Sequence, residues 1–245
     1  MDPNVASAAI GAVAAFVVAI LTVILARLSD VRTEHKKIKN DYLSPLRLYV
    51  EEVHYRIEDM FRFPANRTLL AGPGTVEVSR QPAEWFNGHG CYFASSCYLT
   101  ACLFAAMWRV RGGIPYLRLK RASDTELLTR ILTVSHAFLD DLGIFYVIQH
   151  SIGEQMWDHA ANRVITYRSF CEALQDPVRR VWFDRLLQFY MDVGKDGRLE
   201  QLRRAQKALE ALSRLLDAGA AIEARKQAEQ SRWKSGTPRP QLSAG

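Results

Sequence analysis

The chain has 245 residues, 49% of them hydrophobic and 24% charged, and its formal net charge at pH 7 is +6. This hydrophobic content is ordinary for a globular protein, so most of the chain is expected to fold, and its length allows one sizeable domain. The positive charge is spread along the chain, which favours a protein that functions beside an acidic membrane surface. The chain has no recognisable nucleic-acid-binding motif, which argues against a nucleic-acid partner.

The N-terminal segment is the most informative part of the sequence. No charged side chain lies between Val5 and Ala26, and a helix of that length crosses a hydrocarbon core of roughly 30 Å. The length of the run and the lack of a basic residue before it favour a membrane anchor over a cleaved signal peptide. The basic residues that follow it are Arg27, Arg32, Lys36, Lys37 and Lys39.

This charge asymmetry predicts the orientation, because cytoplasmic flanks are enriched in Lys and Arg. We expect residues 1–27 to form a single-pass transmembrane helix in the plasma membrane, with its N-terminus outside. Residues 28–230 would then form a cytosolic helical domain, and residues 231–245 a disordered tail. Small residues at every fourth position are compatible with self-association of the anchor, but an Ala-rich helix carries small residues on most faces in any case. They are Ser7, Gly11, Ala15 and Ala19.

A juxtamembrane helix is predicted from Ser44-Pro45, an N-cap followed by proline, to Phe63-Pro64. Residues 64–82 show no helical period and predict a long loop, in which Thr75–Val78 is compatible with a short strand.

The segment from Cys91 to Trp108 contains no charge. Its serines and tyrosines favour a buried core helix, and a second membrane span is the alternative. We expect Gly112-Gly113-Ile114-Pro115 to end this helix. The four cysteines contain no C-x-x-C pair and are expected to be buried, reduced hydrophobic residues.

Later helix starts are predicted at three places, two of them capping boxes. These are Ser123–Glu126, Ser151–Glu154 and Asp176-Pro177. Ile144–Ile148 is compatible with a strand or a helix. Gly194 is expected to end one helix, and the last helix is expected to use Leu199 to Leu216. The predicted fold class is therefore mainly α, a transmembrane helix followed by a bundle-like helical domain.

The candidate site consists of His–carboxylate pairs at helical spacing, which place imidazole and carboxylate side by side. If facing helices brought them together they would suit a divalent metal, but di-metal bundles use two Glu-x-x-His motifs and this chain has one. Local salt bridges are the alternative interpretation. The candidate metal ligands are Glu51, His54 and Glu58, then His136 and Asp140, then His150 and Glu154.

The chain has no P-loop, dinucleotide fingerprint or nucleophile elbow. We therefore expect a non-enzymatic interaction or scaffold protein, without a cofactor, whose partners are the lipid bilayer and a protein or a second copy bound through the anchor. The alternatives are a metal-dependent enzyme built on the His–carboxylate pairs and a membrane-associated sensor that uses the loop at residues 64–82.

Overall fold

The computed structural model describes residues 33, 37, 39–117, 121–139 and 143–216. The predicted anchor, the tail and Asp140 lie outside these residues. The chain divides into two compact units, Met1–Ser44 and Pro45–Gly245. In the first unit, a π-helix, η1, covers Lys39–Leu43. The predicted helical architecture is confirmed for the described part of the chain.

The remaining elements are mostly helices of very different length. The first six helices are α2 (Ser44–Arg62), α3 (Pro64–Thr68), α4 (Thr75–Val78), α5 (Ala83–Asn87), α6 (Cys91–Leu117) and α7 (Arg121–Ala137). The others are α8 (Tyr146–Gln155), α9 (Tyr167–Gln175), α10 (Pro177–Arg180), the 3-10 helix η2 (Val181–Phe183), α11 (Asp184–Gly194) and α12 (Leu199–Leu215). A small antiparallel hairpin, β1 (Trp157–Asp158) and β2 (Arg163–Val164), pairs Trp157 with Val164.

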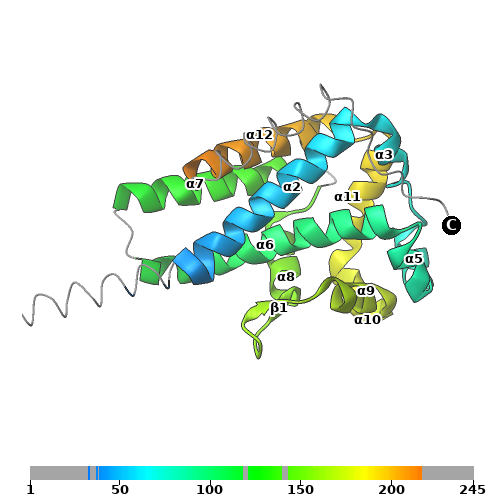
Figure 1. The fold of residues 1–245 in the computed structure, drawn as a ribbon, viewed down its shortest axis with the longest axis horizontal. Helices are drawn as coiled ribbons and strands as arrows, with labels where there is room; N and C mark the ends of the chain where they lie inside the picture. Colours follow the sequence, from blue (N-terminus) through cyan, green and yellow to red (C-terminus); the bar gives the residue numbers. More distant parts are fainter. Residues whose placement is uncertain (1–32, 34–36, 38, 118–120, 140–142, 217–245) are drawn as a thin grey trace, which may run out of the picture. The chain divides into compact units, whose positions relative to one another are not determined.

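Helix α6 supplies the centre of the core. In Figure 1, α7 and α12 lie on one side of α6, and α8, the hairpin, α9 and α10 lie on the other. Phe93, Ala101, Phe104 and Val110 of α6 are each at most 1% exposed. In the described part of the chain, α6 is the helix long and apolar enough to cross a membrane, but 67% of that window is buried inside the protein. This burial favours the core-helix interpretation of the uncharged segment.

A polar network joins α2 to α6. Arg56 Nη1 donates to the hydroxyls of Ser95 and Ser96, each at 3.1 Å, and its guanidinium lies 4.5 Å from the centre of the Tyr92 ring. The Tyr92 hydroxyl donates to Asp59 Oδ2 at 2.9 Å. Because these side chains are partly buried, their mutual hydrogen bonds compensate for lost hydration and fix how α2 lies on α6.

Two short helices lie in the segment predicted as a loop, so that prediction was wrong for residues 64–68 and 75–78, whereas residues 69–74 and 79–82 are not helical. Residues 64–68 form α3, and Thr75–Val78 forms α4 and not a strand. A strand this short needs a neighbour for its backbone, whereas a helical turn satisfies its own: Val78 N–H donates to the Gly74 carbonyl at 3.1 Å.

The predicted end of α6 at Gly112 was also wrong, since the helix continues to Leu117. A glycine inside a helix costs only about 1 kcal/mol relative to alanine, and the buried face of α6 outweighs that cost. Ile144–Ile148, compatible with a strand or a helix in the sequence, lies partly in a helix, because α8 begins at Tyr146.

Neither predicted capping box starts a helix. Helix α7 begins at Arg121, before Ser123, and Ser151 lies inside α8. The Ser151 hydroxyl donates back to the Val147 carbonyl at 3.1 Å, so it bonds within the helix and does not cap one.

The predicted boundaries of the C-terminal helices are confirmed, but the single helix expected from Asp176-Pro177 to Gly194 is divided into α10, η2 and α11. Asp176 caps α10 by accepting hydrogen bonds from the backbone N–H groups of Val178 and Arg179. Helix α11 ends at Gly194, and α12 begins at Leu199.

The cysteines are free, as predicted, and three of the four are buried. Burial raises the pKa of the Cys171 thiol to about 11 and that of Cys97 well above its usual value. Because the thiolate is the reactive form, these residues are expected to be chemically inert.

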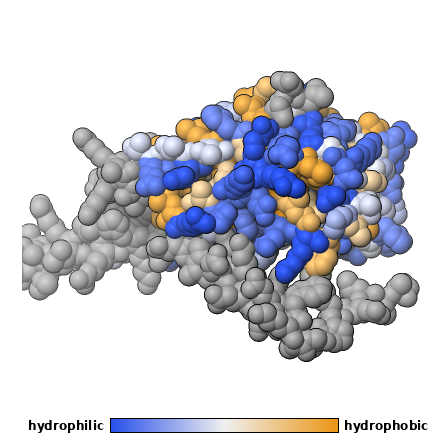
Figure 2. Space-filling model, turned by 90° about the horizontal axis from the view of Figure 1, so that it is seen from above, coloured by the Kyte–Doolittle hydropathy of each residue, from blue (hydrophilic) through white to orange (hydrophobic). Residues whose placement is uncertain are grey.

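The surface of the protein is mainly hydrophilic on the face shown in Figure 2. Hydrophobic residues form separate patches on this face.

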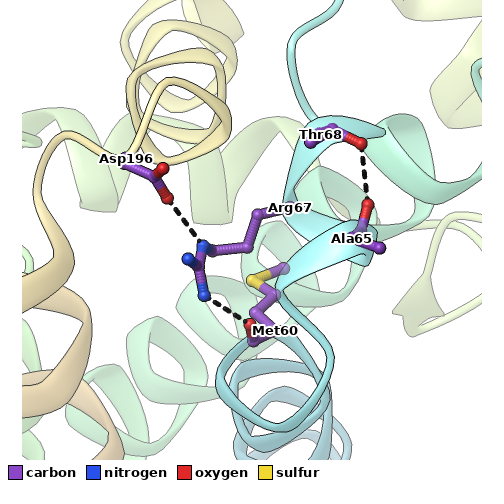
Figure 3. Close-up of polar contacts among 5 residues, drawn as sticks. All are labelled: Met60, Ala65, Arg67, Thr68 and Asp196. Carbon is purple, nitrogen blue, oxygen red and sulfur yellow. Dashed lines mark hydrogen bonds and ion pairs between the residues drawn. The ribbon is translucent and has the colours of Figure 1, made fainter.

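Figure 3 shows how Arg67 ties α3 to the turn between α11 and α12. Its Nε donates to Asp196 Oδ1 at 2.9 Å and its Nη1 to the Met60 carbonyl at 3.0 Å, while Thr68 Oγ1 donates to the Ala65 carbonyl at 2.7 Å.

Candidate functional site

Five side chains from α6, α8 and the hairpin form what we call the aromatic–basic cluster: Arg109, Arg111, Tyr146, His150 and Trp157. The guanidinium carbon of Arg111 lies 4.2 Å from the centre of the Tyr146 ring, and that of Arg109 lies 4.3 Å from the Trp157 ring. The Tyr146 hydroxyl and His150 Nε2 are 2.9 Å apart. Each arginine therefore makes a cation–π contact that fixes its position.

A glycine allows the close approach that assembles this cluster. A Cβ atom on Gly153 of α8 would lie 2.9 Å from the Phe104 carbonyl oxygen and 3.1 Å from Trp108 Cβ, both in α6. Any larger residue would push the two helices apart. The contact places the first turn of α8 beside the last turns of α6, where Arg111 meets Tyr146.

The hairpin turn positions the second arginine. Asp158 Oδ1 accepts hydrogen bonds from the backbone N–H groups of Ala160 and Ala161, both at 3.0 Å. The turn then passes through Asn162, whose φ of 49° lies in the left-handed region that asparagine tolerates better than most residues. Arg109 Nη2 donates to Asn162 Oδ1 at 3.2 Å. The hairpin is therefore tied to α6 by both a stacked ring and a hydrogen bond.

Exposed apolar side chains stand beside the cluster. Phe145 is 49% exposed and Val147 is 68% exposed, and they flank Tyr146 in the chain. Arg111 is half-buried and Arg163 of β2 is exposed. The arrangement thus combines immobilised positive charge with apolar surface open to solvent, which suits binding to a surface that is itself acidic and partly apolar.

The environment of His150 disfavours its charged form. Burial is the largest cause that lowers its pKa from the usual value, Arg111 of α6 adds to the shift, and Glu154 of the same helix opposes it. Desolvation and a nearby positive charge both penalise imidazolium.

We therefore expect the stability of the protein to fall in mild acid. The unfolded chain binds the proton more readily than the folded one, so the stabilising contribution of neutral His150 is lost as pH drops from about 6.5 through the lower folded pKa. His150→Gln should weaken this dependence. Urea unfolding in detergent between about pH 5 and pH 8 measures it, and identical pH profiles for the variant and the parent would contradict the assignment.

The other predicted metal ligands occupy different surroundings. His54 is buried in α2, where Glu51 pairs with Arg47 at 3.2 Å and Glu58 is half-buried. His136 is exposed near the end of α7, and its predicted partner Asp140 is outside the described residues. His150 meets Tyr146, and Glu154 is exposed.

In the part of the chain that the structure describes, no three His, Cys, Asp or Glu side chains are grouped so that they could hold a metal ion. Glu51 forms a local salt bridge, the alternative interpretation of these carboxylates, with Arg47 one helical turn away.

A second exposed surface, which we call the Trp182 patch, lies on α10 and η2. It consists of Val178, Val181 and Trp182, which are 78%, 58% and 50% exposed. Exposed arginines 179 and 185 flank it. The patch has a rigid base, since Phe183 is buried with its ring 5.1 Å from that of Phe170.

Comparisons of the chain with protein-family models, with curated proteins and with solved structures find no match.

Proposed function

We propose that this chain is a membrane-anchored helical scaffold that holds a partner protein at the inner face of the plasma membrane. The observation that carries the proposal is the uncharged run from Val5 to Ala26, followed at once by basic residues. A charged residue at the centre of such a run would cost about 2.5–3.5 kcal/mol, so its complete absence over this length indicates insertion.

The Trp182 patch is the surface that best suits a protein partner. Binding hot spots are enriched in Trp and Arg and lie where apolar side chains can be desolvated. Trp182 directly follows exposed Val181, one helical turn after exposed Val178, and exposed arginines flank it in the chain. The segment is fixed by the Asp176 cap and by the ion pair of Arg180 with Asp184 at 3.1 Å. A surface that is already rigid loses little conformational entropy when it binds.

Photo-crosslinking in intact membranes tests the protein partner. A benzophenone amino acid in place of Val178 should give one discrete protein adduct, and the same residue in place of exposed Lys207 on α12 should not. Trp182→Ser should lower the adduct yield about tenfold or more, because removing a hot-spot side chain costs at least about 2 kcal/mol. Equal yields at positions 178 and 207 would contradict the proposal.

The anchoring half of the proposal has its own test. The full chain should stay in membranes after extraction with alkaline carbonate. A C-terminal tag should be digested only when protease reaches the cytoplasmic face. Release by carbonate, or digestion of the tag from outside, would contradict the predicted topology.

A further inference from the structure

Two arginines of the aromatic–basic cluster, Arg109 and Arg111, lie in the C-terminal half of α6, towards the end of the domain that the chain enters from the predicted anchor. Helices α2 and α6 run antiparallel: Arg56 of α2 bonds Ser95 and Ser96 near the start of α6, while Tyr49, earlier in α2, lies beside Cys102, later in α6. The N-terminal end of α2 and the C-terminal end of α6 are therefore at the same end of the second unit, and Figure 1 shows the same arrangement.

Chain length limits how far this end can move from the bilayer. The residues between Arg27 and Pro45 reach at most about 60 Å if extended and about 26 Å if helical. A tether of this length gives a high effective concentration of the domain at the membrane surface, so even a weak contact between the two would be populated.

The charges at this end fit an acidic surface. Arg109 and Arg111 are the charged residues of α6, and both lie in its C-terminal part. The sequence continues with Arg118, Lys120 and Arg121 before the first acidic residue, Asp124. Glu154 and Asp158 are the acidic groups of α8 and of strands β1 and β2, the elements that carry the rest of the cluster.

We propose that Phe145, Val147 and Arg111 form a lipid-contact face that rests on the anionic leaflet to which the chain is anchored. This inference builds on the proposed function, because it takes the anchor as given. Phe145 and Val147, which are 49% and 68% exposed, enter the interface between headgroups and acyl chains. Arg111, held 4.2 Å from the Tyr146 ring, binds lipid phosphate. The contact holds the domain against the membrane in one orientation and directs its other faces to partners.

The test uses the full chain reconstituted in vesicles of phosphatidylcholine, with or without phosphatidylserine. A benzophenone amino acid replaces Phe145 in one sample and exposed Lys207, on α12, in another. We expect several times more lipid adducts from position 145 than from position 207, and more with phosphatidylserine than without it. Arg111→Glu should reduce the adducts at position 145 severalfold, whereas Lys207→Glu should not.

Carbonate extraction of the same samples separates the two proposals. Retention in the membrane with no excess of lipid adducts at position 145 overturns the lipid-contact face and leaves the anchor intact. Release by carbonate overturns the anchor itself. Equal adduct yields in the two vesicle types, or adducts to protein in place of lipid, also overturn the contact with anionic lipid. Far-ultraviolet circular dichroism of each variant establishes that it is folded.

Discussion

Replacing Phe138 by alanine is expected to lower the free energy of unfolding by about 3–5 kcal/mol. Phe138 directly follows α7 and is fully buried. Its ring lies 5.3 Å from the ring of Phe104 in α6 and 5.6 Å from that of Phe189 in α11. The substitution removes the ring that joins three helices and leaves a cavity between them, which adds to the lost transfer free energy. Urea unfolding of the full chain in detergent, followed by tryptophan fluorescence, measures the change.

Phe145→Ala is the matched control, because it makes the same chemical change at a side chain that is 49% exposed. We expect it to alter the free energy of unfolding by no more than about 0.5 kcal/mol. Similar losses for both variants would show that α7 does not pack on α6 and α11 through Phe138.

Long amphipathic segments made the helical fold predictable. The apolar residues that define the period of α2 include Leu46, Val50, Val53 and Ile57, and all four are buried. The prediction of a helix start was correct at Asp176, where the aspartate can cap the helix and the following Pro177 cannot continue a preceding one. They failed at Ser151, because a serine hydroxyl is also satisfied within a helix. Gly112 failed as a helix end for a related reason, since packing of the whole helix outweighs one local preference.

The candidate site was much less predictable. Of the aromatic–basic cluster, the sequence pattern selected only His150, and it selected it as a metal ligand beside Glu154. Its contacts are with Tyr146 in its own helix and with the neighbouring charge of Arg111 in α6. Periodicity shows which face of a helix is buried, but it does not show which other helix packs there. The signal available in the sequence was the pair Arg109 and Arg111, which directly follows the uncharged segment from Cys91 to Trp108.

Replacing Gly194 by alanine is expected to destabilise the protein by about 1–3 kcal/mol or more, although it adds a single methyl group. A Cβ atom there would lie 2.5 Å from the Ala71 backbone nitrogen and 2.7 Å from the Leu70 carbonyl carbon. Because these atoms belong to the backbone, no side-chain rotation relieves the clash, and the segment after α3 must move away from α11. That movement also strains the nearby ion pair of Arg67 with Asp196 (Figure 3).

Gly112→Ala provides the opposite control. Apart from the chain neighbours of Gly112 and the backbone of its own helix, no atom of the described residues lies within 4 Å of a Cβ placed on Gly112, which is exposed in α6. Alanine should therefore stabilise the helix by about 0.5–1 kcal/mol, because it reduces the backbone entropy of the unfolded chain. Unfolding free energies that move in opposite directions for the two variants would establish that the loss at Gly194 comes from its backbone neighbours. A loss at both positions would instead point to a general intolerance of alanine, and equal stability of Gly194→Ala and the parent would show that residues 70–71 do not pack on the end of α11.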